Sequence, residues 1–309
     1  MSIRTPVVGS PASGTAGGVP TRTARRSGVA RRLLTGSAAL ALSLTALTVV
    51  ATTPAGASTA KYAGIVSDRS GTGYWLVQAG GGVFPHGSAP TLTNTQCDAQ
   101  FTAPVLGVVS TPDHLGLWEY DAKGGIACFG DAADYGSTDG ITLPHPVVGM
   151  ASSYDGAGYD MVDSSGGIYS FGDACYQGHP VTLVGKKPIV AIATSPLGSP
   201  TCSSTGYWEV GSTGYVYPYG VALSYGNVNS KSRLVTIVAT PDGLGYWELA
   251  RSGVVSNYGD AAPLGWTSVA TSQRMVAMAT SPDGTGYWEL GLHGIVWPEG
   301  SAVSYGNGS

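Results

Sequence analysis

Residues 235–265 read VTIVATPDGLGYWELARSGVVSNYGDAAPLG, and this stretch decides the fold because its pattern returns along the chain. Its most regular part is a Gly-Tyr-Trp anchor, which occurs six times in this or a closely related form, roughly 39 to 48 residues apart; the anchors begin at Gly73, Gly116, Gly158, Gly206, Gly245 and Gly286. A repeat of roughly 40–45 residues with strand-like sequence inside each unit is typical of β-propeller blades. The sequence therefore predicts one repeat domain of six similar units.

Each unit combines strand-like segments with tight turns. Within residues 235–265, four strand segments are predicted, at 235–240, 246–250, 254–258 and 261–265. The first is rich in β-branched residues, as a buried strand is, and the second carries the aromatic pair Tyr246-Trp247. Pro241-Asp242-Gly243 is turn chemistry, because proline fixes φ and glycine allows a positive φ. We therefore expect an all-β fold, a six-bladed β-propeller of four-stranded antiparallel blades.

The six units fill residues 58–309 without an obvious shared blade. The other five begin near Tyr62, Leu106, Val148, Val190 and Val276. The first unit begins with a first strand, and residues 302–307 supply the outer strand of the last. We therefore expect the ring to close by packing between the first and sixth blades, or with help from disulfides. The nearest alternative is an open solenoid of β-hairpins, whose repeat would be much shorter.

A family resemblance supports this architecture. The turn sequences Pro241-Asp242-Gly243 and Pro282-Asp283-Gly284 resemble those of WD40-like propeller repeats. Residues 279–288, ATSPDGTGYW, are still more similar to the Gly-Tyr-Trp repeats of secreted proteins from high-GC Gram-positive bacteria. In that family such arrays accompany cell-wall hydrolase domains or stand alone. The resemblance covers nearly all of residues 58–309 and implies a propeller outside the cell, but it implies no activity.

The first 57 residues are expected to lie outside the domain. Residues 1–20 are rich in Gly, Pro, Ser, Thr and Ala without periodicity, and are expected to be disordered. An uncharged apolar run at 33–50 follows a basic region containing Arg22, Arg25, Arg26, Arg31 and Arg32. With the small residues that come next, this order is typical of a secretory signal peptide, and we expect cleavage after Ala57 or Ala60.

A retained membrane anchor is the alternative to cleavage. A spanning helix needs about 20 predominantly apolar residues, whereas the run at 33–50 is short and diluted by Ser, Thr and Gly. We therefore expect a secreted or cell-surface protein that meets a membrane only if the leader is uncleaved.

Composition narrows the classes of function. Charged residues form only 11% of the chain, against about 25% in typical soluble proteins. Without the leader arginines the chain is acidic and has no basic stripe, which excludes nucleic acid as a partner. The sequence also lacks Cys-x-x-Cys, His-Glu-x-x-His, Gly-x-Ser-x-Gly and a glycine-rich phosphate loop. No metal, cofactor or enzyme signature is therefore predicted, and a monomer is expected.

Four cysteines in a chain with an export signal indicate disulfides. Four allow three pairings. Cys202 lies in an insertion within the first hairpin of the fourth unit, and Cys175 lies just past the third-to-fourth-strand corner of the third. In a propeller both turns open on one face, so we expect Cys175 to pair with Cys202, and Cys97 with Cys128 by elimination. The same argument places the linker with Cys97 on the opposite face, so geometry does not support the second pair directly.

Two sets of recurring carboxylates are candidate ligands. One set occupies the same slot after the anchor in four of six units: Glu119, Glu209, Glu248 and Glu289. A carboxylate ring can hold a cation or a sugar, but Leu76 and Met161 in the other two units favour a structural slot facing the neighbouring blade. The other set follows glycine in a Gly-Asp-Ala corner and is interpreted as fixing that turn: Asp131, Asp173 and Asp260. A calcium site would need six or more convergent oxygens, which this pattern does not supply.

Residues that depart from the repeat are the better binding candidates. Trp266, Trp297, Tyr217 and Tyr219 are aromatics outside the anchors, and they either stack on sugar rings or fill irregular gaps. Asp160 replaces the anchor tryptophan of the third unit, which marks either a specialised site or a decayed repeat.

Three functions follow from these observations. The first is a secreted, non-enzymatic propeller that binds a glycan, a cell-wall polymer or a protein. The second is a propeller-type glycoside hydrolase or lyase, which needs two carboxylates roughly 5–10 Å apart; only Asp160 with Asp155 or Asp163 suggests such a pair. The third is a structural cell-surface protein. Convergence of the off-pattern residues on one rim would favour binding or catalysis, and scatter would favour the structural function.

Overall fold

The computed structural model describes residues 62–94, 97, 101, 103–197, 201–268 and 273–308. The expected leader, residues 1–57, and the expected cleavage positions after Ala57 and Ala60 lie outside this range. The described residues form six three-stranded antiparallel sheets, so the protein is all-β. No helix in this part of the chain is long and apolar enough to cross a bilayer.

Each sheet consists of three consecutive strands. The first strands are β1 (Tyr62–Ser67), β4 (Val105–Ser110), β7 (Val147–Ser152), β10 (Ile189–Thr194), β13 (Leu234–Ala239) and β16 (Met275–Thr280). The second strands are β2 (Gly73–Gln78), β5 (Leu117–Asp121), β8 (Gly158–Asp163), β11 (Gly206–Gly211), β14 (Gly245–Ala250) and β17 (Gly286–Gly291). The third strands are β3 (Val83–Gly87), β6 (Ile126–Phe129), β9 (Ile168–Gly172), β12 (Val216–Gly220), β15 (Val255–Gly259) and β18 (Val296–Gly300).

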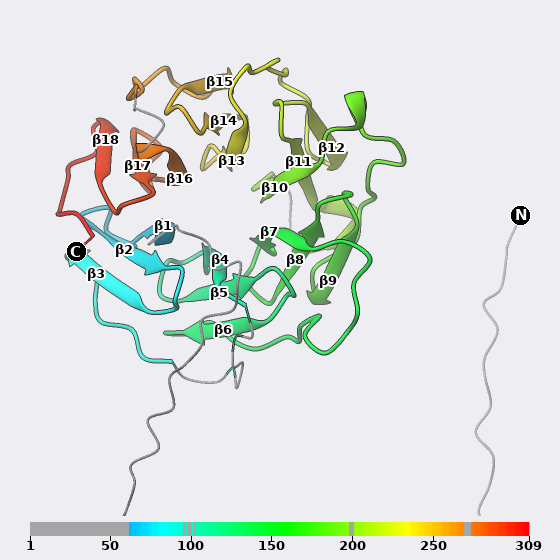
Figure 1. Ribbon diagram of the computed structural model, residues 1–309, viewed down its shortest axis with the longest axis horizontal. Helices are drawn as coiled ribbons and strands as arrows, with labels where there is room; N and C mark the ends of the chain where they lie inside the picture. The colour runs from blue at the N-terminus through cyan, green and yellow to red at the C-terminus, as the bar shows by residue number, and fades with distance from the viewer. Residues whose placement is uncertain are drawn as a thin grey trace, which may run out of the picture. The chain divides into compact units, whose positions relative to one another are not determined.

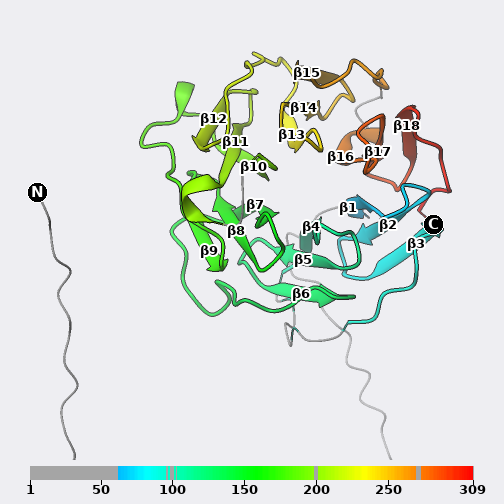
Figure 2. The ribbon, with the colours of Figure 1, turned by 180° about the vertical axis from the view of Figure 1, so that it is seen from behind.

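The sheets lie around a common axis. Figure 1 shows the first strand of every sheet innermost and the third outermost, and Figure 2 shows the same order from behind. Two short 3-10 helices lie in connecting segments, η1 (Val184–Lys186) and η2 (Cys202–Ser204).

The Gly-Tyr-Trp anchor forms the contacts between neighbouring sheets. Successive side chains of a strand point to opposite faces, so Tyr246 and Trp247 of β14 face different neighbours. The Tyr246 ring packs on Trp208 of the fourth sheet, with ring centroids 5.4 Å apart, and Trp247 packs on Tyr287 of the sixth, at 5.9 Å. Both faces of β14 are therefore covered, and all six of its residues are buried.

The prediction of a fourth strand in each blade is wrong. Residues 261–265 and 302–307 form no ladder, although they follow the third strands as expected. Their backbone groups instead bond to side chains: Trp247 Nε1 donates to the Ala262 carbonyl at 2.9 Å, and Trp288 Nε1 donates to that of Val303 at 2.8 Å. Gly265, at a φ of 122°, then directs the chain away from strand geometry.

The next sheet holds the far end of each segment through the anchor tyrosine. Tyr207, for example, accepts a hydrogen bond from the Gln177 N–H at 3.1 Å and donates one to the Gly178 carbonyl at 2.6 Å. The second sheet has Leu117 in the tyrosine position and lacks this hydroxyl. There the segment pairs directly with the edge of the sheet, through an isolated bridge between Asn94 and Phe129.

The sixth sheet packs against the first in the same manner. Tyr74 accepts a hydrogen bond from the Tyr305 N–H at 3.1 Å, donates one to the Gly306 carbonyl at 2.5 Å, and packs on Trp288 with ring centroids 5.5 Å apart. The expected packing between the first and last units is therefore present. Within the described residues no hydrogen-bonded ladder joins two of the sheets, so the array is not closed by strand pairing.

Both expected disulfides are present, Cys97–Cys128 and Cys175–Cys202, each with Cα atoms 5.2 Å apart. The structure supplies the contact that the sequence argument lacked for the pair Cys97–Cys128. The bridge between Asn94 and Phe129 lays the preceding segment along β6, which brings Cys97 to Cys128.

The second disulfide fixes a segment that is bound by the anchor tryptophan in the other sheets. In five sheets the anchor indole binds the carbonyl fifteen residues further on, as Trp208 binds that of Leu223. In the third sheet the anchor position is Asp160, and the residue fifteen further on is Cys175. A bond to Cys202 of the fourth unit fixes this segment instead.

Candidate functional site

The first strands of all six sheets line one cavity of about 430 Å³, which we call the axial cavity. Its wall is mostly small and apolar, with one residue from each strand in Ile65, Val105, Val148, Val190, Val235 and Val276. The cavity lies toward the end where the first strands begin, because it contains residues from the starts of β1, β4, β13 and β16. Its volume is within the range of about 300–1,000 Å³ typical of ligand pockets.

Three arginines stand at the mouth of the axial cavity. Arg233 directly precedes β13, Arg274 directly precedes β16, and Arg251 lies in the turn between β14 and β15. Arg233 and Arg251 are exposed and Arg274 is half-buried. Partial burial lowers the pKa of Arg251, and repulsion from Arg233 and Arg274 lowers it further. No carboxylate is among the residues that line this cavity.

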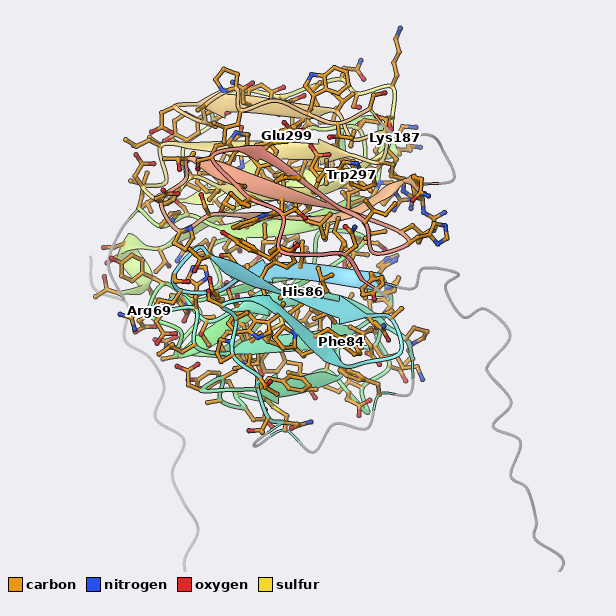
Figure 3. All side chains as sticks on the ribbon, turned by 90° about the vertical axis from the view of Figure 1, so that its left-hand side faces the viewer. Arg69, Phe84, His86, Lys187, Trp297 and Glu299 are labelled. Carbon is orange, nitrogen blue, oxygen red and sulfur yellow. A yellow bond between two sulfur atoms is a disulfide. The ribbon has the colours of Figure 1, made fainter. Side chains whose placement is uncertain are left out.

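Charge is divided between the two ends of the array. Antiparallel pairing places the turns between second and third strands at the end where the first strands begin. Seven of the eight Lys and Arg residues in the described part of the chain lie at this end: Lys123, Lys186, Lys187, Lys231, Arg233, Arg251 and Arg274. Figure 3 shows Lys187 at one end and the eighth residue, Arg69, at the other.

The opposite end carries most of the acidic turns. Asp113, Asp155, Asp242 and Asp283 lie in the turns after first strands, and the candidate corner residues Asp131, Asp173 and Asp260 lie after third strands. Thr111 Oγ1 donates to Asp113 at 2.8 Å and to Asp131 at 3.3 Å, so it links the two turns of the second unit. In the fifth unit, desolvation raises the pKa of Asp260, and the neighbouring Asp242 raises it further. The corner aspartates thus hold turns together.

This acidic end has a cavity of its own, about 610 Å³ in volume. It is lined by the ends of β4, β7, β10 and β13 and by turn residues that include Arg69, Asp113 and His114. His114 binds back to the first unit, where its Nδ1 lies 3.0 Å from the Ser67 carbonyl oxygen. A cavity therefore lies at each end of the inner strands, but only the cavity at the basic end has charged side chains of a single sign in its lining.

The recurring glutamates lie in the interfaces between sheets. All four are buried, and oxygen atoms of each lack a hydrogen-bond partner: Glu119, Glu209, Glu248 and Glu289. Glu209 lies against Gly166 in a turn of the third sheet, and Glu248 against Gly214 in the equivalent turn of the fourth. Met161 contacts Gly124 in the same way. A thioether in the equivalent contact indicates a packing position between sheets.

Burial makes these glutamates weak acids. Desolvation raises the pKa of Glu119 to about 7, of Glu209 to about 9, and of Glu248 and Glu289 to about 8. For Glu209 the charge of Asp163 adds to the effect. Glu209, Glu248 and Glu289 are therefore largely neutral at neutral pH and Glu119 is about half ionised, so the four side chains do not form a fully charged ring.

The structure does not bring the aromatic candidates together. Trp297 and Tyr217 occupy the same register position, opposite Glu289 and Glu209, so they follow the repeat after all. Trp297 packs in the interface between the fifth and sixth sheets, and Tyr217 accepts a hydrogen bond from the Val184 N–H at 2.6 Å. Tyr219 packs on Tyr207, with ring centroids 5.7 Å apart. These three side chains fill gaps between elements.

Trp266 is different, because 52% of its surface is exposed. It precedes Thr267, whose carbonyl oxygen lies against Gly253 in the turn that also carries Arg251. Trp266 thus lies at the basic end, outward from the axial cavity. It is the one aromatic candidate available to a ligand there.

Asp160 lies in a small pocket near the acidic end. It is 7% exposed, accepts a hydrogen bond from Ser170 at 2.5 Å, and shares the pocket with Asp155 and Asp173. Burial raises the pKa of Asp160 to about 6. The pocket measures only about 20 Å³, close to the roughly 10–15 Å³ that one water needs.

Asp163, the other suggested partner of Asp160, points elsewhere. Its Oδ1 accepts hydrogen bonds from the Ser165 and Gly167 N–H groups, and its Oδ2 accepts one from Tyr169. It fixes the turn between β8 and β9. The described residues also contain no group of three or more His, Cys, Asp or Glu side chains arranged to hold a metal ion.

No protein-family model matches the chain, and no curated protein matches it significantly. The three arginines are the site residues that sequence reasoning missed. The repeat itself contained the signal: the positions equivalent to Arg233 hold Pro146 and Pro188 in the third and fourth units, and the position equivalent to Arg251 holds Ser212 in the fourth. Arginines that replace proline or serine at equivalent positions mark a departure from the repeat.

Proposed function

We propose that the chain is a secreted, non-enzymatic β-propeller that binds a glycan, a cell-wall polymer or a protein partner through the axial cavity. In this proposal each three-stranded sheet is one blade, and the six blades form a WD40-like ring whose first and last members meet by side-chain packing. The Gly-Tyr-Trp repeats and two disulfides support a protein that works outside the cell.

One observation carries the proposal. Residues from all six units line the axial cavity of about 430 Å³, and three arginines that break the repeat stand together at its mouth. Repeated residues build the array, whereas residues that break the repeat and converge on one mouth indicate a ligand. A purely structural protein has no need of such convergence.

The rival hydrolase or lyase is less well supported. Its best carboxylates, Asp155 and Asp160, do line one pocket, but a space of about 20 Å³ admits a water and not a sugar ring. The third carboxylate there, Asp173, has a raised pKa caused by desolvation and by Asp155, as expected for crowded turn residues.

A plug variant tests the proposal. Leu106 lines the axial cavity and is 42% exposed, so Leu106→Trp is expected to fill the cavity without disturbing the packing between sheets. Leu115→Trp is the matched control, because Leu115 is 44% exposed in the turn between β4 and β5 at the opposite end. The mature protein should co-sediment saturably with cell-wall sacculi or bind soluble glycans, and only Leu106→Trp should weaken this binding.

Two outcomes would contradict this function. Either the wild type binds no wall preparation, glycan or secreted protein, as the structural function predicts, or both tryptophan variants bind as the wild type does. Release of reducing sugar from the wall by the wild type, lost in Asp160→Asn, would favour the hydrolase instead.

A further inference from the structure

We propose that the mouth of the axial cavity binds an oxyanion, a phosphate or carboxylate group, between the guanidinium groups of Arg233, Arg251 and Arg274. This inference deepens the proposed function. It relies on that function only for the assignment of the axial cavity as the ligand site. The new element is the charge and chemistry of the group that enters.

Backbone hydrogen bonds hold the three arginines side by side. The Arg251 N–H donates to the Arg233 carbonyl at 2.9 Å, and the Arg251 carbonyl accepts from the Met275 N–H at 2.9 Å. Met275 directly follows Arg274, whose own carbonyl accepts from the Leu292 N–H at 2.9 Å. Arg251 is thus hydrogen-bonded to the segments on both sides of it, and the cluster is built into the junction between the fifth and sixth sheets.

Among the described residues, no acidic side chain compensates the positive charge of this cluster. The axial cavity has no acidic residue in its lining, and the three arginines have no ion pair among the described residues. Asp121 and Asp163, at this end, accept hydrogen bonds from N–H groups of their own turns. Like charges held together cost free energy, so an anion from solution relieves a repulsion that the fold maintains.

The chemistry of arginine selects the ligand class. A guanidinium presents a planar fork of donors that matches the two oxygens of a carboxylate or phosphate. Below the arginines the wall is apolar, with Val235 and Val276 among its residues. The site therefore fits a ligand whose anionic group remains at the rim while a neutral stem enters the cavity. A free small anion and a charged group on a wall polymer share this chemistry.

Calorimetry with pyrophosphate and with citrate, at low ionic strength, tests the inference. Wild-type protein is expected to bind at least one of them, and added NaCl should weaken binding by screening. The triple variant Arg233→Gln/Arg251→Gln/Arg274→Gln should lose at least about tenfold in affinity, since it loses several charge-assisted hydrogen bonds. Arg69→Gln, at the opposite end, is the matched control and should bind as the wild type does.

Thermal unfolding provides a readout that does not need the triple variant. Pyrophosphate should raise the melting temperature of the wild type more than NaCl of equal ionic strength does, and the single variant Arg251→Gln should reduce this increase. Absence of binding to both anions would overturn the inference, as would equal affinity in the wild type and the triple variant.

The two proposals can fail separately. If the triple variant loses pyrophosphate or citrate but still co-sediments with the wall, the oxyanion site stands as a site for a free small anion and the ligand of the wall lies elsewhere. If anion binding is absent and Leu106→Trp nevertheless abolishes wall binding, the proposed function stands and the oxyanion inference is wrong.

Discussion

At the scale of single residues, the repeat uses carboxylates in two opposite ways. The turn aspartates are hydrogen-bonded near the surface, as Asp242 is to the Thr240 hydroxyl at 2.8 Å and the Leu244 N–H at 3.1 Å. The interface glutamates are buried, and several of their oxygens have no partner. The sequence showed both sets as repeats and favoured structural positions, but it did not show that the glutamates are desolvated. That depends on the neighbouring sheet, which no single unit encodes.

Replacing one interface glutamate should make stability less dependent on pH. Burial raises the pKa of Glu248 to about 8 in the folded state, whereas an unfolded glutamate titrates near about 4.3. The folded state therefore binds the proton more tightly, and wild-type stability falls as pH rises from the unfolded pKa through the folded one. The difference of about 4 pKa units between the two states corresponds to about 5 kcal/mol, so Glu248→Gln should retain up to that amount of what the wild type loses between acidic and alkaline pH.

Urea denaturation across the pH range measures this effect. Glu248→Met, which copies the third unit, is the matched comparison and should flatten the profile in the same way. A wild-type stability that rises with pH over this interval would show that the glutamates are charged and paired in the folded protein.

At the scale of elements, three strands of each unit were predictable and the fourth was not. The β-branched runs and aromatic anchors signal strands by their composition, and tight turns separate them. The outer segment also looked strand-like, but its partners are the side chains of Trp247 and Tyr287 and not another backbone. Sequence pattern cannot distinguish these two partners. The same reasoning explains why the pair Cys97–Cys128 had no direct support from the sequence, since an isolated bridge at Asn94 directs the segment that leads to Cys97.

The anchor tyrosines should stabilise the array through their hydroxyls. Tyr246 donates to the Gly226 carbonyl at 2.7 Å, so Tyr246→Phe leaves that carbonyl unpaired and should cost about 1 kcal/mol. Tyr258→Phe is the control, because the Tyr258 ring packs on Tyr246 with ring centroids 5.5 Å apart and its hydroxyl forms no hydrogen bond with a described residue. Equal unfolding free energies for the two variants in urea would mean that the tyrosine hydroxyls do not hold the sheets together.

The disulfide that replaces the missing indole contact should contribute measurably to stability. Cys175 and Cys202 are 27 residues apart, and closing such a loop stabilises by about 3 kcal/mol in the chain-entropy model. Cys175→Ser/Cys202→Ser should lower the free energy of unfolding by about 3 kcal/mol. The melting temperature, measured by circular dichroism, should fall accordingly. A variant as stable as the wild type would indicate that Ser170, Asp160 and their neighbours hold the segment without the bond.

At the scale of the whole molecule, similarity between units builds the scaffold and difference between units builds the site. The repeat predicted that the sixth unit would pack on the first, and the structure shows that Tyr74 and Trp288 make this contact. It did not predict that Arg233, Arg251 and Arg274 would meet, because they come from different units and from positions before and between strands. Only the arrangement of all six sheets places them at one mouth.

Small-angle scattering of residues 58–309, the expected mature protein, checks this arrangement in solution. Six blades around an axis should scatter as a compact disc, and the profile should not depend on protein concentration if the chain is a monomer. An elongated rod would mean that the units stack as an open solenoid and that the contacts of Tyr74 are not maintained.

The most direct test of the central claim is a methyl NMR titration of the mature protein with solubilised cell-wall fragments. If the axial cavity binds the ligand, the methyl signals of Leu106, Val235 and Val276 should shift saturably, since all three line that cavity. Those of Leu115 and Leu244, in turns at the opposite end, should stay in place. Shifts confined to Leu115 and Leu244 would contradict the account and would place the ligand at the acidic end.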